Sequence, residues 1–218
     1  MTGRRAFLAL AAASCACTMA GAAQGADKWR PGQHYTLVEN PQAPSVPSGK
    51  VEINEFFWYS CGHCYALDPV LEEWNSRKAA YIQFVRTPVI WGGPGERQFA
   101  KLYYTLLALR RPELHAKVFD AIHQQGLVLI GPDDTKVRAR QAAFLAGFDV
   151  TPAQFDAAFD SMMVAVNVQR AEKATMDFKV ANVPTLIING KFATRVDLAG
   201  GEPQLLSLLD DLAAGEKR

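Results

Sequence analysis

Short apolar runs along the chain have the pattern of β-strands. Val51 to Trp58 begins with apolar side chains at every second position and ends apolar on both faces, which predicts a central strand. Ile82 to Val85 and Thr185 to Ile188 are apolar runs of strand length and predict two more. Asn189-Gly190 follows the last run and is a strong signal for a tight hairpin. Two further short strands are expected at residues 35–38 and 191–194.

Between and after these runs, the apolar residues recur at helical spacing. Leu67 to Trp74 has apolar side chains at i, i+3, i+4 and i+7, which predicts a helix beginning near residue 61. Residues 96–171 carry several such stripes, and Leu205 to Leu212 carry one more. The expected order is β-β-α-β, a helical block, then β-β-α. This order predicts an α/β fold with a helical block between its strands.

One helix inside the block has a recognisable start. Thr151 suits the N-cap, Pro152 suits the first helical position, and Gln154 can complete a capping box. The apolar residues that follow on one face include Met162 and Met163. Because methionine readily fills irregular gaps in apolar cores, we expect this pair to be buried rather than to bind a ligand or cofactor.

Residues 1–26 have the three parts of an export signal in order. Arg4-Arg5 precedes the apolar run Ala6 to Ala13, which is too short to span a bilayer, and small residues follow where cleavage would occur. The paired arginines also suit a twin-arginine signal, so the choice between the Sec and twin-arginine routes stays open. Cleavage would remove Cys15 and Cys17. The mature protein would then hold two cysteines in an oxidising compartment.

Composition and charge exclude some classes of partner. The chain has 218 residues, of which 49% are hydrophobic, enough for a substantial core. Its formal net charge is +1, and loss of the two arginines at the N-terminus would change this to −1. We therefore expect no nucleic-acid partner. Because no apolar stretch reaches membrane-spanning length, we expect a soluble mature protein.

Cys61-Gly62-His63-Cys64 places two cysteines three residues apart at the junction of a predicted strand and helix. In a first helical turn, two such side chains lie on one face and are close enough to form a disulfide. Cys61 would face unpaired N–H groups and the positive end of the helix dipole, which lower its pKa. A protonated His63 would act in the same direction. We predict that Cys61 is the exposed sulfur that is attacked, and that Cys64 is the buried resolving cysteine.

Two other roles are compatible with a single CxxC motif. The pair could be half of a zinc site, but zinc takes four ligands, and the sequence has no second CxxC. His115 and His123 are too far apart for the usual ligand pair, and His34 stands alone. We therefore expect no metal and treat these histidines as surface or core residues. A purely structural disulfide is also disfavoured, because so short a loop constrains the unfolded chain little.

Glu55 is the second candidate residue. It shares the predicted strand face of several apolar side chains, and burial would raise its carboxyl pKa. Such a group could relay a proton to or from Cys64. Two alternatives stay open: Glu55 reaches solvent at a strand edge, or it pairs with Arg86 on the neighbouring predicted strand.

Val183-Pro184 is the third candidate, because it opens a strand that the sheet order could place beside the cysteines. A cis peptide bond there would let Val183 present backbone groups to an extended peptide. The general preference for trans bonds leaves this open.

Taken together, these residues resemble the DsbA family of periplasmic thiol oxidases. The resemblance runs from Tyr35 to near the C-terminus and rests on the motifs Glu55-Phe56-Phe57, Cys61-Gly62-His63-Cys64-Tyr65, Ala171-Glu172-Lys173-Ala174, Val183-Pro184 and Asn189-Gly190-Lys191. It implies a thioredoxin fold, formed by residues 27–95 and 172–218, with an inserted helical domain at 96–171. It also implies a cis Pro184 and a buried acid at Glu55. The well-known members carry Pro where this chain has Gly62, which bears on its oxidising strength.

The function expected on these grounds is that of a periplasmic thiol:disulfide oxidoreductase without a cofactor. It would donate a Cys61–Cys64 disulfide to reduced exported proteins through a mixed disulfide. The resemblance implies reoxidation by a quinone-linked membrane partner of the DsbB type, and we expect a monomer. The alternatives are a disulfide isomerase or reductase on the same fold, and a non-catalytic exported metal-binding protein.

Overall fold

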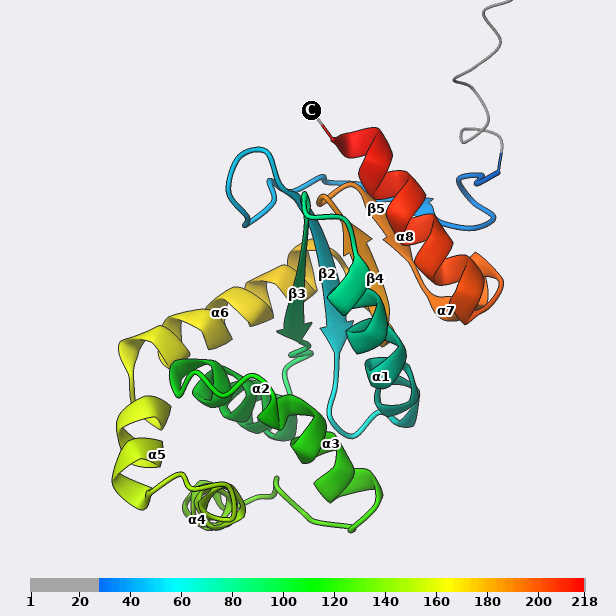
Figure 1. Cartoon of the computed structure of the whole chain (residues 1–218). Coiled ribbons are helices and arrows are strands. Elements are labelled where there is room, and N and C mark those ends of the chain that lie inside the picture. Colours follow the sequence, from blue (N-terminus) through cyan, green and yellow to red (C-terminus); the bar gives the residue numbers. More distant parts are fainter. Residues whose placement is uncertain (1–27, 218) are drawn as a thin grey trace, which may run out of the picture.

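The computed structural model describes residues 28–217, which form one mixed five-stranded sheet with helices on both faces (Figure 1). The strand order is β1-β5-β4-β2-β3, in which β2 and β3 are parallel and the other neighbours are antiparallel. The predicted strands are therefore confirmed, with ends shifted by up to three residues. Their bounds are β1 Thr36–Leu37, β2 Val51–Phe57, β3 Ile82–Pro88, β4 Thr185–Ile188 and β5 Phe192–Thr194.

Strand β2 is central, and all seven of its residues are buried. Its side chains alternate between the two faces of the sheet, so Ile53 and Glu55 point one way and Asn54 points the other. Asn189 and Gly190 both have positive φ angles and form the turn between β4 and β5, as the sequence predicted. A Cβ at Gly190 would lie 2.0 Å from the carbonyl oxygen of Gln42, so this turn also requires glycine for space.

Two longer helices cover one face of the sheet. They are α1 (Gly62–Arg77) and α8 (Glu202–Glu216), with the short α7 (Val196–Ala199) before the second. Figure 1 shows α1 and α8 on the same side of β2 and β4. The apolar stripes predicted from the sequence pack here, because Leu67 and Leu71 of α1 and Leu205 and Leu208 of α8 join one buried cluster with Ile53.

Five helices lie between β3 and β4 in the sequence. They are α2 (Pro94–Ala108), α3 (Leu114–His123), α4 (Asp134–Ala146), α5 (Pro152–Phe159) and α6 (Met162–Asp177). They share a buried core that continues to Phe57 and Cys64, so this helical block packs directly against the start of α1. The predicted block of helices between the third and fourth strands is confirmed. Its division from the rest as a domain at residues 96 and 171 stays a prediction.

Local interactions fix the ends of α5 and α6. Thr151 and Gln154 form the predicted capping box, with Thr151 Oγ1 accepting from the Gln154 backbone N–H at 3.3 Å. Ser161 then caps a new helix, α6. This second start turns Met162 and Met163 outward, with 77% and 46% of their surface exposed. The prediction that the methionine pair fills the core was therefore wrong.

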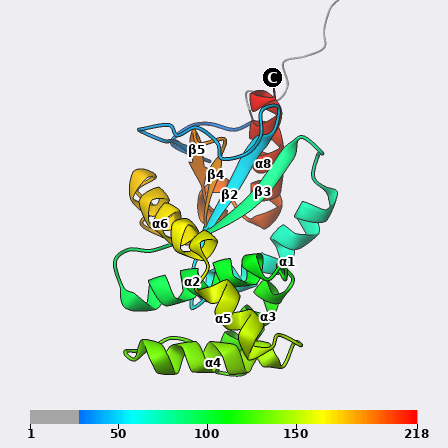
Figure 2. The same ribbon diagram turned by 90° about the vertical axis from the view of Figure 1, so that its left-hand side faces the viewer.

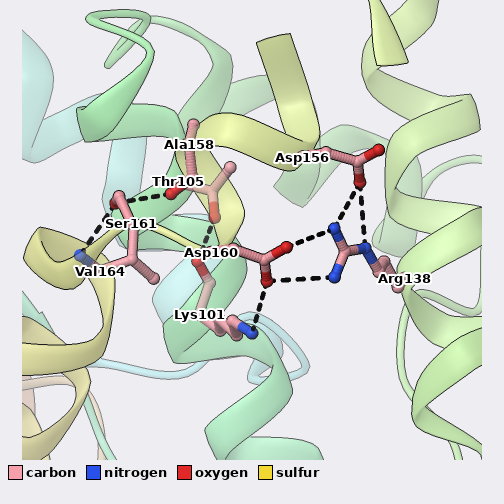
Figure 3. Close-up of polar contacts among 8 residues, drawn as sticks. All are labelled: Lys101, Thr105, Arg138, Asp156, Ala158, Asp160, Ser161 and Val164. Atoms are coloured by element: carbon pink, nitrogen blue, oxygen red, sulfur yellow. Dashed lines mark hydrogen bonds and ion pairs between the residues drawn. The ribbon is translucent and has the colours of Figure 1, made fainter. Parts of the chain in front are cut away.

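Charged side chains join α2, α4 and α5 (Figure 3). Arg138 of α4 contacts Asp156 of α5 at 2.6 Å and Asp160, the residue after α5, at 2.7 Å. Lys101 of α2 lies 3.8 Å from Asp160 and 3.7 Å above the ring of Phe159. Such bidentate pairs fix the relative orientation of two helices more firmly than single contacts do.

The described residues contain no helix that is long and apolar enough to cross a membrane. The predicted export signal at residues 1–26 lies outside the described residues.

Candidate active site

The cysteine pair sits where the chain leaves β2 and begins α1. Cys61 is the N-cap residue of this helix, as predicted, and its Sγ accepts a hydrogen bond from the Cys64 backbone N–H at 3.4 Å. Its own backbone N–H donates to the Trp58 carbonyl at 2.9 Å. Cys61 is partly exposed, whereas Cys64 is fully buried. The two sulfurs are not bonded to each other.

The surroundings of Cys61 lower its pKa to about 6. The largest cause is a hydrogen bond from the Cys64 side chain; the backbone N–H groups of Cys64 and His63 add to it, and burial opposes it. The charge of His63 contributes least of these causes. The predicted direction therefore agrees with the structure, but the neighbouring thiol matters more than the imidazole. That same hydrogen bond, together with burial, raises the pKa of Cys64 far above its usual range.

Val183 and Pro184 lie beside the cysteines, as the sheet order requires. The peptide bond between them is cis, which confirms what the family resemblance implied. The Val183 carbonyl oxygen is 3.6 Å from Cys61 Sγ, although the two residues are 122 positions apart. Both residues line a cavity of about 530 Å³ together with His63 and Ala66. The carbonyl and the cavity thus flank the accessible sulfur.

Glu55 is buried on the face of the sheet that α1 covers, with 1% of its surface exposed. The reading in which it reaches solvent at a strand edge was therefore wrong, and the reading in which it pairs with Arg86 is confirmed. Arg86, directly opposite on β3, donates from Nε to Glu55 at 2.9 Å. Burial raises the pKa of Glu55 to about 7, while the charge of Arg86 acts in the opposite direction.

Arg86 also binds two carboxylates of α1. Its Nη2 lies 2.9 Å from Asp68 and 2.7 Å from Glu72. Burial alone would lower the pKa of Arg86, but Glu55, Asp68 and Glu72 outweigh it and raise that pKa. The Arg86 guanidinium therefore pairs with the carboxylates of Glu55, Asp68 and Glu72. Despite this pairing, burial raises the pKa of Glu55.

The sequence did not predict two buried residues near the cysteines, Asp68 and His115. Asp68 lies one turn after Cys64 and faces the core, a position that its i+4 spacing could have revealed. His115 of α3 is buried, with Nδ1 2.8 Å from the Tyr59 hydroxyl and Nε2 3.3 Å from Asp68. Burial lowers the pKa of His115. Nothing in the sequence around His115 indicated this position.

His123 and His34 each make a polar contact with a backbone group. His123 stacks on Tyr65 with ring centroids 4.7 Å apart and contacts the Tyr59 carbonyl at 2.8 Å. His34 accepts a hydrogen bond from the Arg30 backbone N–H. Across residues 28–217, no group of three or more His, Cys, Asp or Glu side chains is arranged to hold a metal ion.

Comparison with known proteins assigns the chain to a family. No family model matches it. It is 33% identical to the thiol:disulfide interchange protein DsbA of Pseudomonas aeruginosa over 211 residues, covering 96% of both chains. It is 36% identical to the DsbA of Bordetella parapertussis over 214 residues, again covering 96% of both. The chain belongs to the DsbA family.

Solved DsbA structures agree with this assignment. The crystal structure of P. aeruginosa DsbA matches with a TM-score of 0.77 at 32% identity, covering 88% of this chain and 96% of that one. DsbA from Xylella fastidiosa matches with a TM-score of 0.75 at 28% identity, covering 86% and 97%. This member of the DsbA family is a thiol:disulfide oxidoreductase with a thioredoxin fold and a helical insertion, as the sequence predicted.

Proposed function

We propose that this DsbA-family protein donates a disulfide from Cys61 and Cys64 to reduced proteins in the periplasm. The observation that carries the proposal is the contrast between the two sulfurs. Cys61 is accessible and its pKa is about 6, whereas Cys64 is buried and its pKa is strongly raised. A site that stabilises one thiolate in the dithiol form favours its own reduction, and therefore favours oxidation of the partner.

The reaction proceeds by two thiol–disulfide exchanges. A substrate thiolate attacks Cys61 Sγ of the oxidised pair, a mixed disulfide forms, and the bond to Cys64 breaks. Cys64 leaves with the electron pair and takes up a proton. A second substrate thiolate then attacks the substrate sulfur of the mixed disulfide and releases Cys61 as a thiolate. Two electrons pass from the substrate to the enzyme, and the low pKa of Cys61 makes it a good leaving group.

Glu55 supplies the proton that Cys64 takes up. With a pKa of about 7, it is protonated in a substantial fraction of molecules at neutral pH. Its negative charge also contributes to raising the pKa of Cys64, which supports a proton transfer between the two groups. Arg86 holds the carboxylate after the proton has left.

The substrate binds as an extended segment beside Val183 and Pro184. The Val183 carbonyl can accept a backbone hydrogen bond from such a segment next to Cys61, and the adjoining cavity can hold a neighbouring side chain. This arrangement recognises backbone more than sequence, which suits an enzyme with many clients.

Residues 1–26 direct export to the periplasm and are then removed, by either the Sec or the twin-arginine route. A quinone-linked membrane oxidase of the DsbB type returns the dithiol to the disulfide. The mature protein acts as a monomer and needs no cofactor for the exchange itself.

The redox equilibrium with glutathione tests the proposal. We expect the protein to be mostly reduced in buffers in which an unperturbed dithiol would be oxidised. An equilibrium as reducing as that of thioredoxin would instead support a reductase. Gly62 makes this measurement informative, because the well-known oxidases of the family carry Pro at that position.

A further inference from the structure

A second hollow lies on the face of the sheet opposite α1, away from the cysteines. It has a volume of about 430 Å³ and is bounded by β2, β3, α2 and α6; we call it the α6 groove. Figure 2 shows this side of the molecule, with α6 beside the strands. Glu52 and Asn54 of β2 line it, whereas Ile53 and Glu55 point to the other face.

Three polar side chains that line the α6 groove make no hydrogen bond within the described part of the chain, and one of them has an enclosed polar atom. Asn54, Thr87 and Tyr104 have 7%, 8% and 8% of their surface exposed. None of the three side chains hydrogen-bonds to any residue between 28 and 217, and Asn54 Oδ1 is fully enclosed. Buried polar groups are nearly always paired in folded proteins, because desolvation without a hydrogen bond is costly. Asn54 has such a group, and the unpaired hydroxyls of Thr87 and Tyr104 line the same hollow, so the groove offers hydrogen-bonding groups to a polar ligand.

Arg170 of α6 adds a positive charge to the same groove. It has no carboxylate partner in the described part of the chain, whereas neighbouring Lys173 is held by Asp177. Burial raises the pKa of Tyr104 and the charge of Arg170 lowers it, so the guanidinium lies near that hydroxyl. A free guanidinium fork binds carboxylate and phosphate groups in a bidentate manner.

The negative charge of Glu52 favours a carboxylate over a phosphate as the ligand of this groove. Its carboxylate lines the groove and accepts hydrogen bonds from the backbone N–H and the hydroxyl of Ser45, and no cation among the described residues neutralises it. A doubly charged phosphate would be repelled by this carboxylate more strongly than a singly charged group. The groove therefore suits a monoanion.

We propose that the α6 groove binds a small organic carboxylate. Arg170 holds the carboxylate, while the hydroxyls of Thr87 and Tyr104 hydrogen-bond to the polar body of the ligand beside the Asn54 amide. A hollow of this size is within the usual range for small-molecule sites. The charged cavity beside Lys101 and Arg138 differs, because Arg138 is already bound to Asp156 and Asp160 (Figure 3).

An NMR titration of the ¹⁵N-labelled mature protein tests the proposal. The probes are N-acetylglycine and 4-hydroxybenzoate as carboxylates, N-acetylglycinamide as the uncharged control, and inorganic phosphate. We expect at least one carboxylate to give saturable shifts confined to amides around the groove, and the uncharged amide to give none. Arg170→Ala should weaken this binding about tenfold or more, because it removes a charge-assisted hydrogen bond. Tyr104→Phe should weaken it about threefold or more while keeping the ring in place.

Arg77→Ala is the matched control, since Arg77 is an exposed arginine on α1, outside the groove. It should leave binding unchanged. Absence of saturation by both carboxylates up to about 50 mM would overturn the proposal. So would binding that Arg170→Ala and Tyr104→Phe leave intact, and binding of phosphate alone would overturn the assignment to carboxylates. The titration spectra also report whether each variant is folded.

Discussion

Replacing His63 by alanine tests how the structure sets the acidity and the oxidising strength of the cysteine pair. The imidazole is exposed and its charge is the smallest of the causes that lower the pKa of Cys61. The hydrogen bonds from the Cys64 side chain and from the first turn of α1 remain in the variant. Most of the stabilisation of the thiolate should therefore survive the substitution.

The magnitude follows from the size of the whole effect. The pKa of Cys61 falls from 9.0 to about 6, and four contributions share this lowering against the opposing effect of burial. The smallest of them should account for about one unit or less, equivalent to about 1.4 kcal/mol. For a two-electron couple, that energy corresponds to about 30 mV. His63→Ala should therefore raise the pKa of Cys61 by about one unit or less and make the reduction potential more negative by about 30 mV or less.

Two measurements check this expectation. Thiolate absorbance against pH gives the pKa of Cys61, and equilibration with glutathione buffers gives the potential. The reasoning fails if the potential moves without the pKa, or if Cys61 in the variant returns to the pKa of a free thiol, about 8.5. The second outcome would mean that the imidazole, and not the hydrogen bonds at the helix start, stabilises the thiolate.

The same lowered pKa makes the stability of the reduced protein depend on pH. Because the pKa is lower in the folded state, the thiolate stabilises the fold fully above the unfolded pKa, about 8.5, and this contribution is lost as the pH falls through about 6. The difference between about 6 and about 8.5 corresponds to about 3 kcal/mol, which solvent screening of the partly exposed sulfur reduces to about half. Urea unfolding of the reduced protein at pH 5 and pH 8, with Cys61→Ser as the control, should show this difference. Equal pH dependence in both proteins would contradict it.

Three further predictions concern the roles of single residues. Cys64→Ala should accumulate mixed disulfides with client proteins and Cys61→Ala almost none, as non-reducing gels would show; equal trapping would mean that both sulfurs are accessible. Glu55→Gln should slow exchange and remove the inflection of the rate near pH 7 in stopped-flow measurements, because a neutral amide cannot supply the proton; an unchanged profile between pH 5 and 8 would leave Glu55 a structural role. Gly190→Ala should destabilise the protein by about 2 kcal/mol or more, because its Cβ would lie 2.0 Å from a backbone oxygen, whereas Gly215→Ala, in open space on α8, should stabilise it by about 0.5–1 kcal/mol. Urea unfolding compares the two, and a similar effect of both substitutions would refute the steric argument.

Features that depend on nearby residues were predictable from the sequence. The strand at Val51–Phe57, the helix start at Cys61, the capping box at Thr151 and the turn at Gly190 all follow from side-chain periodicity or from backbone preferences over a few residues. The direction of the pKa shift at Cys61 was predictable for the same reason, since the donors lie within its own helical turn.

Only the tertiary structure decided what surrounds that helix start. The order of the strands brings Val183 to the Cys61 sulfur from 122 residues away, and it sets Arg86 against Glu55. Packing of the helical block brings His115 to Asp68 and continues the buried core from that block to Phe57 and Cys64. Periodicity in the sequence says which face of an element is buried, but it does not say which other element covers that face. For this reason, the motif alone predicted the reactive sulfur, whereas the folded chain decided the protonation of the buried acid behind it.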